Sequence, residues 1–180
     1  MIQLDEIEKH SNDYILDINL NFNSVRELNL NSNRIKEIKR NTFQKSKNLQ
    51  KLWLANNKIK EIREKTFLEL NNLKELYLFH NKIEELYQNE FQGLNCLKTL
   101  DLSWNSIAKI HQESFQGLTN LETLSLSNNQ IKVIYENTFV RLNNLKELNL
   151  IKNDIIYRYS DWFVMLSNKG VEIKLNKITF

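Results

Sequence analysis

The amino-acid sequence predicts an α/β solenoid, a right-handed superhelix with a parallel sheet on its concave face and an irregular or briefly helical convex side. Three observations predict it. An aliphatic motif recurs every 24 residues from residue 25 to residue 168. Leucines within each motif alternate as they do in a half-buried strand. Asparagine recurs at one motif position, in a chain with three glycines and no proline to form its turns.

The strand of each coil is predicted by the pattern Leu-x-x-Leu-x-Leu-x-x-Asn, as at Leu49, Leu52, Leu54 and Asn57. Strand side chains point alternately to opposite faces, so Leu52 and Leu54 share one face and the residue between them takes the other. One coil cannot bury its leucines alone, whereas stacked coils with strands about 4.8 Å apart form a continuous core. The six motifs begin at Val25, Leu49, Leu73, Leu97, Leu121 and Leu145.

Two further columns of side chains follow from the same period. The asparagine stands where the strand turns inward, so its amide is expected to hydrogen-bond backbone groups of the turns. Ten residues further on, each coil has a phenylalanine, which predicts a second column that packs the convex side. The asparagines are Asn33, Asn57, Asn81, Asn105, Asn129 and Asn153, and the phenylalanines are Phe43, Phe67, Phe91, Phe115, Phe139 and Phe163.

The competing interpretation is a set of amphipathic helices, because Leu49 and Leu52 are three residues apart. Leu54 breaks such a helical face, and six repeats in constant phase favour the solenoid. With this motif and its phenylalanine, the chain resembles the leucine-rich-repeat family, in the 24-residue class found in Toll-like and other extracellular receptors. The resemblance implies a horseshoe-shaped, non-enzymatic binding module. Many extracellular members carry cysteine-bridged caps, which this chain lacks because Cys96 is its only cysteine.

We expect one domain, organised as an N-terminal capping segment (residues 1–24), six repeats (25–168) and a C-terminal capping strand (169–180). The caps are expected because a solenoid must cover its terminal coils. Upstream, residues 15–20 alternate like a strand and are predicted to cap the first repeat.

The C-terminal cap is predicted at residues 171–175, a strand that follows a one-residue slip of the repeat. Ile178 replaces the asparagine expected after it, so the ladder is predicted to stop there. Just before this strand, residues 161–166 predict a more helical back segment, in which Trp162 closes the core.

Composition excludes a membrane-spanning protein, because no segment approaches 18 consecutive apolar residues. The first residues are acidic where a secretory signal would be basic and then apolar, and no Asn-x-Ser/Thr site occurs. Together with the lack of disulfide caps, these features favour an intracellular protein, and an extracellular fragment of a longer receptor is the alternative.

The sequence predicts no enzyme, no cofactor and no metal site. His10, His80 and His111 fall in different phases of the repeat, and no pair has metal-ligand spacing with cysteine or carboxylate. Glycine-rich phosphate loops and the Gly-x-Ser-x-Gly and Cys-x-x-Cys motifs are absent. Cys96 stands where neighbouring coils have asparagine, which favours a structural substitute over a nucleophile.

Function is expected on the concave-face residues that point outward, where aromatic side chains cluster on adjacent coils. Exposed Trp and Tyr supply a large apolar area at low entropic cost, which is typical of interaction hot spots. The alternative is that these side chains cover one another without a partner. The predicted protein-binding site consists of Trp53, Tyr77, Phe79, His80, Asp101 and Trp104, with Asn29, Lys51, Glu75, Ser125 and Asn149 extending the footprint.

A second feature is a basic run from Arg34 to Lys65, with 11 basic residues against 3 acidic ones in a chain whose total charge is +3. These cations follow the strands and are expected on an edge or the back of the first coils. An anionic partner, whether acidic protein, nucleic acid or lipid headgroup, is the functional interpretation. A solvated face is the alternative.

Two other functions stay open from the sequence. One is a structural solenoid that self-assembles through the aromatic patch. The other is a targeting domain of a larger receptor or enzyme. The sequence indicates neither the ligand nor the oligomeric state.

Overall fold

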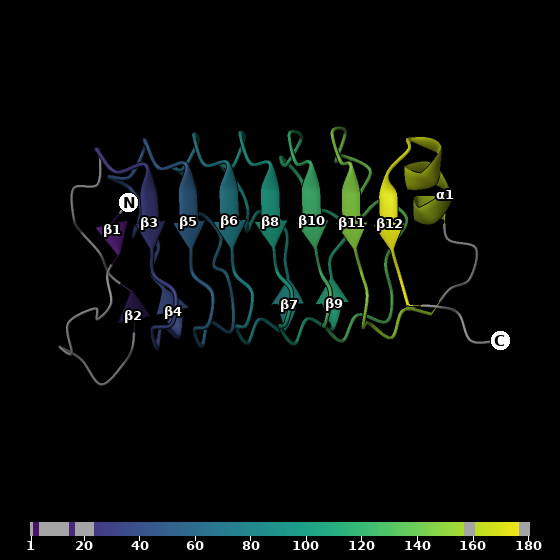
Figure 1. Cartoon of the computed structure of the whole chain (residues 1–180), viewed down its shortest axis with the longest axis horizontal. Coiled ribbons are helices and arrows are strands. Elements are labelled where there is room, and N and C mark those ends of the chain that lie inside the picture. The colour runs from purple at the N-terminus through teal and green to yellow at the C-terminus, as the bar shows by residue number, and fades with distance from the viewer. Residues whose placement is uncertain (1, 4–14, 17–23, 157–160, 177–180) are drawn as a thin grey trace.

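The computed structural model describes residues 2–3, 15–16, 24–156 and 161–176. Within these residues the chain winds as a solenoid around a parallel sheet of eight short strands, whose order follows the chain (Figure 1). This confirms the predicted fold. The strands are β1 (Ile2–Gln3), β3 (Glu27–Asn29), β5 (Lys51–Trp53), β6 (Glu75–Tyr77), β8 (Thr99–Asp101), β10 (Thr123–Ser125), β11 (Glu147–Asn149) and β12 (Glu172–Lys174).

The strands pair in the register that the repeat predicts. Leu52 lies beside Leu76, and Leu76 beside Leu100, each in the middle of its strand and fully buried. The residues on either side of each middle leucine are only partly buried, as the alternation requires. We number the coils 1 to 6 from the motifs that begin at Val25, Leu49, Leu73, Leu97, Leu121 and Leu145.

The asparagine column joins neighbouring coils through backbone groups, as predicted. The Nδ2 of Asn81 donates to the carbonyl oxygens of Leu54 in coil 2 (2.9 Å) and Leu78 in its own coil (3.0 Å). Its Oδ1 accepts from the backbone N–H of Ile59 (3.1 Å). Each amide therefore satisfies three backbone groups that the turn leaves without a partner. The same bonds are formed by Asn57, Asn105, Asn129 and Asn153.

The residue before each of these asparagines is in the left-handed conformation, with φ between 52° and 58°. Asparagine tolerates this conformation better than other non-glycine residues, which explains Asn56 and Asn128. His80, Trp104 and Lys152 hold the same conformation in their coils. Asparagine therefore forms some of these turns, while larger side chains occupy the same position in others.

The convex side contains the phenylalanine column. Phe43 and Phe67 stack with their ring centroids 6.1 Å apart, and Phe115 and Phe139 with theirs 5.8 Å apart. Short strand pairs also lie outside the main sheet: β2 (Ile15–Leu16) pairs with β4 (Glu37–Ile38), and β7 (Glu85–Leu86) pairs with β9 (Lys109–Ile110).

The last place in the aromatic column was predicted for Phe163, and this is wrong. Trp162 packs edge-on to Phe139 at 5.7 Å and is 1% exposed, whereas Phe163 is 38% exposed. The cause is α1 (Asp161–Asn168), because adjacent residues of a helix point about 100° apart and only one can face the core. The helical back segment and the core-closing role of Trp162 are confirmed.

The C-terminal strand is confirmed, whereas the described part of the N-terminal segment is the short strand β2, which pairs with the first coil outside the main sheet. Ile173 of β12 pairs with Leu148, one residue beyond the 24-residue spacing, as the predicted slip requires; Ile178 lies outside the described residues. At the other end, β2 pairs with β4, whereas the place beside β3 is held by β1. β2 and β4 form a separate two-stranded sheet, so Ile15 and Leu16 lie on another side of the coil from the main sheet. Residues 17–20 are not among those described, and the division into caps and repeats stays a prediction.

Candidate binding face

The main sheet places the predicted binding residues in columns on one face. Trp53, Tyr77 and Asp101 are in register on β5, β6 and β8, each at the end of its strand. Lys51 and Glu75 begin the first two of these strands. The same outward position belongs to Asn29, Ser125 and Asn149 on the other strands, while Phe79, His80 and Trp104 follow β6 and β8.

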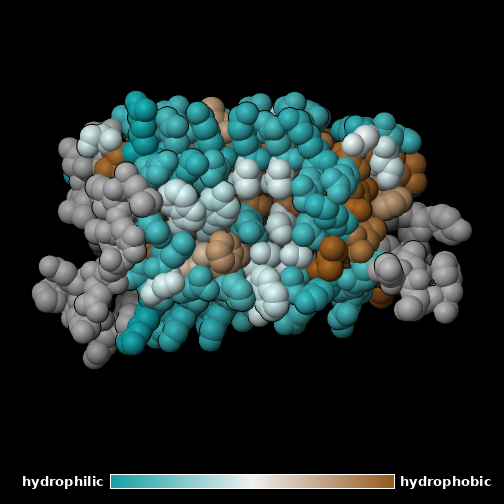
Figure 2. Space-filling view, viewed as in Figure 1, coloured by the Kyte–Doolittle hydropathy of each residue, from teal (hydrophilic) through white to brown (hydrophobic). Residues whose placement is uncertain are grey.

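The structure brings the aromatic side chains together as two groups. Trp53 and Tyr77 stack almost in parallel, with centroids 5.9 Å apart and 7° between the planes. His80 stacks on Trp104 at 5.0 Å, and Phe79 packs edge-on to His80 at 5.9 Å. Trp104 is still 49% exposed. Figure 2 shows residues of intermediate and apolar character over the middle of this face, with hydrophilic residues along its upper and lower edges and further apolar residues toward its C-terminal end.

Glu75 holds the Tyr77 ring of the Trp53–Tyr77 stack in place through the phenolic hydroxyl. The Tyr77 hydroxyl donates to Glu75 Oε2 at 2.9 Å, and the Lys51 ammonium lies 3.0 Å from Glu75 Oε1. Partial burial, together with the hydrogen bond to Glu75 and its negative charge, raises the pKa of Tyr77 to about 12. The phenol is therefore neutral at physiological pH, and the Glu75 carboxylate is engaged on both oxygens.

Asp101 occupies a turn that two other coils build with asparagine. Its Oδ1 accepts from the backbone N–H of Ser103 (2.9 Å) and from the Ser103 hydroxyl (2.6 Å). In the same way, the Oδ1 atoms of Asn29 and Asn149 each accept a hydrogen bond from the backbone N–H of the residue two positions later in the chain. Such turns hold the side chain in one orientation. In coil 5 the hydroxyls of Ser125 and Ser127 lie 3.4 Å apart.

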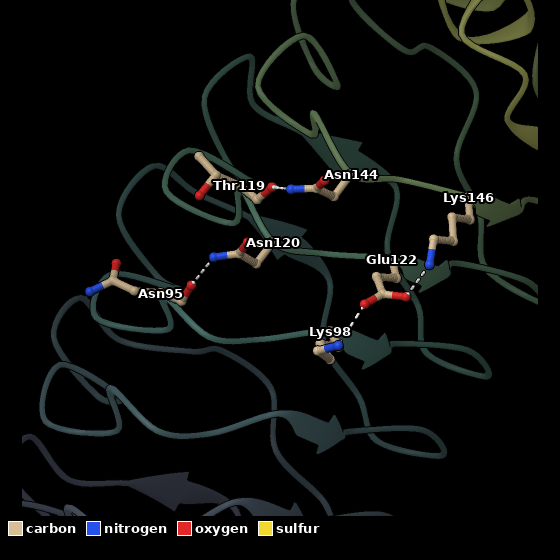
Figure 3. A network of polar contacts seen from close by, with 7 residues as sticks. All are labelled: Asn95, Lys98, Thr119, Asn120, Glu122, Asn144 and Lys146. Carbon is tan, nitrogen blue, oxygen red and sulfur yellow. Dashed lines mark hydrogen bonds and ion pairs between the residues drawn. The ribbon is translucent and has the colours of Figure 1, made fainter.

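Beside this face, where the chain enters the strands, a groove of about 370 Å³ lies over coils 3 to 6. Figure 3 shows Glu122 between Lys98 (2.8 Å) and Lys146 (2.6 Å). Hydrogen bonds from these two lysines lower the pKa of Glu122 to about 2. This groove was not predicted from the sequence, although Lys98, Glu122 and Lys146 stand at one position of the repeat. The lining residues are Lys74, Cys96, Lys98, Asn120, Glu122, Asn144 and Lys146.

Cys96 takes the place of an amide that joins neighbouring coils. Asn120 Nδ2 donates to the Asn95 carbonyl at 2.8 Å, and Asn144 Nδ2 donates to the Thr119 carbonyl at 2.7 Å. Cys96 stands at the same position at the end of coil 3 and is exposed. Its thiol is a weaker donor than an amide.

The predicted basic surface lies on the turns that follow the strands, apart from the aromatic groups. Arg34 and Lys58 of the predicted run share the position after the asparagine in coils 1 and 2, Lys82 beyond the run holds it in coil 3, and all three are exposed. Backbone bonds from Lys58 to Ile35 and from Lys82 to Ile59, both 2.8 Å, hold these coils in register. We call Arg34, Lys58, Lys60 and Lys82 the basic ridge.

The histidines do not form one site. His80 stacks on Trp104, His111 stacks on Tyr87 at 4.9 Å outside the main sheet, and His10 lies outside the described residues. Over residues 24–156 and 161–176, no three His, Cys, Asp or Glu side chains gather as a metal site would require. In the same ranges, no helix combines the length and apolar character needed to cross a bilayer.

Comparisons with known proteins agree with this architecture. A search of curated protein sequences returned no match. Among solved structures, a chain of the "Octameric complex of Latrophilin 3 (Lec, Olf), Unc5D (Ig, Ig2, TSP1) and FLRT2 (LRR)" is 29% identical with a TM-score of 0.73, over 84% of this chain and 47% of that one. A chain of the "TLR13-ssRNA13 complex" is 28% identical with a TM-score of 0.67, over 82% of this chain and 25% of that one.

The present chain therefore spans about half the length of the first of these proteins and a quarter of the second. The leucine rich repeat family matches residues 23–83, 47–107 and 97–155, which together cover more than half of the chain. The protein belongs to the leucine-rich-repeat family.

Proposed function

We propose that this protein is a non-enzymatic protein-binding module that recognises its partner on the concave face of the solenoid. The observation that carries the proposal is the aromatic surface formed by Trp53, Tyr77, Phe79, His80 and Trp104 on three consecutive coils. Large aromatic side chains on an open sheet face are typical of interaction hot spots.

The fold itself does not require these aromatic residues. The positions of Trp53 and Tyr77 hold Asn29 and Asn149 in coils 1 and 6, and the leucine core beneath is the same. Trp104 lies in the left-handed conformation at φ 55°, where a large non-glycine residue costs about 1 kcal/mol. A side chain kept against such a cost is more typical of a functional position than of a structural one.

The similar structures support a binding role for the repeat domain. Both are described as complexes, one of several proteins and one with single-stranded RNA. They are larger chains, so their particular partners are not transferred to this protein.

The test is capture of partners from a lysate with a double variant, Trp53→Asn with Tyr77→Asn, which introduces the residue that coils 1 and 6 have at this position. Capture is expected to be lost while the unfolding midpoint is retained. The control is Tyr135→Asn, which removes an exposed aromatic ring outside the main sheet and should leave capture intact. Capture that survives the double variant overturns the proposal.

A second candidate is an anionic partner on the basic ridge. Its specific support is that Arg34, Lys58 and Lys82 repeat at one position of consecutive coils, where like charges a strand spacing apart repel one another. A polyanion would relieve this repulsion. Retention on a heparin column should fall after Lys58→Glu with Lys82→Glu, and fall with rising salt. Loss of partner capture with this variant, but not with the aromatic one, would make the ridge the binding site.

A further inference from the structure

The concave face changes character between coils 3 and 4. Tyr77 and Phe79 in coil 3 are followed, at the same positions of coil 4, by Asp101 and Ser103. Coil 5 has Ser125 and Ser127 there. We call Ser103, Ser125 and Ser127 the serine floor, because their side chains are short and rise only to a single hydroxyl group above the sheet. A chain bound beside the aromatic groups can thus approach the backbone of β8 and β10 closely.

Asp101 stands at the edge of this floor as an oriented carboxylate. Its Oδ1 is engaged by Ser103 through two hydrogen bonds, which leaves Oδ2 for another donor. Two other acids of this face each form an ion pair with a lysine of this chain: Glu75 with Lys51 at 3.0 Å, and Glu147 with Lys174 at 2.7 Å. Across residues 24–156 and 161–176, Asp101 forms no ion pair.

Trp104 lies beyond Ser103 and attracts a cation of its own chain. His80 stacks on the indole from coil 3, and the Lys152 ammonium lies 5.5 Å from the ring centroid, having reached it from coil 6. Trp104 is nevertheless 49% exposed, so a ligand can reach the indole, and the Lys152 contact indicates that a positive charge is stabilised over the ring. In coil 5, between Trp104 and Lys152, the corresponding residue is Asn128.

We infer that Asp101, Trp104 and the serine floor form a seat for an arginine side chain of the protein partner. A planar guanidinium can lie against the indole and donate to a carboxylate at the same time, which an ammonium does less well. An apolar occupant would leave the Asp101 carboxylate without solvent or a counter-charge, at a large energetic cost. This inference rests on the proposed function, because it names the chemistry of the partner at the same face.

The test uses a blocked tripeptide, acetyl-Gly-Arg-Gly-amide, titrated into the isotopically labelled protein up to about 10 mM, well above a dissociation constant near 1 mM. We expect the peptide to shift the Trp104 indole N–H and the Ser103 and Ser127 amide signals. The same peptide with citrulline, which has the shape of arginine without its charge, should produce no shift. Equal shifts from both peptides, or none from either, overturn the inference.

Two variants match the chain's own repeats and so keep the fold. Asp101→Asn preserves the turn that Asn29 and Asn149 form in their coils, and should weaken arginine binding at least fivefold. Lys152→Asn, which introduces the residue of coil 5, removes a competing cation and should strengthen binding. Unchanged affinity in Asp101→Asn, or weaker binding in Lys152→Asn, contradicts the seat.

The two proposals fail in different ways. If the arginine peptide does not bind while Trp53→Asn with Tyr77→Asn still abolishes partner capture, the proposed binding face is supported and the arginine seat is refuted. If capture survives that double variant, the proposed function itself falls, whatever the peptide does.

Discussion

Glu90 is a buried acid at a position that other coils fill with a hydroxyl residue. Thr42, Thr66, Ser114 and Thr138 stand at the same phase of the repeat. The Ser114 hydroxyl donates to the Leu86 or His111 carbonyl, each at 2.7 Å. Glu90 is 1% exposed, and its carboxyl oxygens have no well-formed hydrogen bond within the described part of the chain, where only the Tyr87 backbone is close enough to act on the carboxyl group. Replacing it by threonine is therefore predicted to stabilise the protein.

The magnitude follows from the pKa. Burial raises the pKa of Glu90 from 4.5 to about 8, against an opposing hydrogen bond from the Tyr87 backbone and with the negative charge of Glu61 adding to the rise. Between these values the unfolded chain loses the proton and the folded chain keeps it, so this group makes stability fall as pH rises through the window. At about 1.4 kcal/mol for each pH unit, the loss is about 3 kcal/mol at pH 7 and approaches 5 kcal/mol above pH 8.

Urea unfolding of the wild type and Glu90→Thr at pH 5, 7 and 8.5 measures this directly. The variant should gain about 1 kcal/mol at pH 5 and about 4 kcal/mol more at pH 8.5. Glu90→Gln, which keeps the shape and removes the ionisation, should show the same pH dependence relative to the wild type. A stability difference that does not change with pH would refute the reasoning.

Three further predictions test the fold. Asn81→Ala leaves three backbone groups without partners and should lower the free energy of unfolding by about 3 kcal/mol, measured by urea unfolding; an unchanged midpoint would contradict the asparagine column. Trp104→Asn relieves a left-handed tryptophan and should raise that free energy by about 1 kcal/mol; a clear loss would show that the ring is structural. Trp162→Ala should cost about 3 to 5 kcal/mol and Phe163→Ala less than about 1 kcal/mol, by thermal unfolding; the reverse order would restore Phe163 to the column.

The parts of the fold that could be predicted from sequence are those that repeat. Leu52, Leu76 and Leu100 carry a 24-residue phase that fixes both the direction of each side chain and the register of each strand pair. The hydrogen bonds of Asn81 to backbone groups could be predicted for the same reason, because asparagine recurs at this position in six coils. Its amide has both donors and an acceptor for those groups.

The place of the N-terminal strand and the exceptions within the coils could not be predicted, because the repeat alone does not decide them. The alternation at residues 15–20 fits a strand in the main sheet and equally a strand on another side of the coil. Only the pairing of β2 with β4 distinguishes these two placements. Phe163 kept the phase of its column, but α1 turned Trp162 inward instead. Glu90 went unnoticed because its environment comes from neighbouring coils rather than from adjacent residues.

The candidate site divides in the same way. Its columns of outward residues followed from the strand alternation. The stacking of His80 on Trp104 and the turn that orients Asp101 depend on side-chain conformations, which a residue pattern does not specify.

The central claim is that the aromatic face recognises a protein partner. Its most direct measurement is the dissociation constant of the captured partner for the wild type and for Trp53→Asn, with the free energy of unfolding measured alongside. A hot-spot residue worth about 2 kcal/mol or more predicts a loss of at least about thirtyfold with unchanged stability. An unchanged dissociation constant would contradict the account.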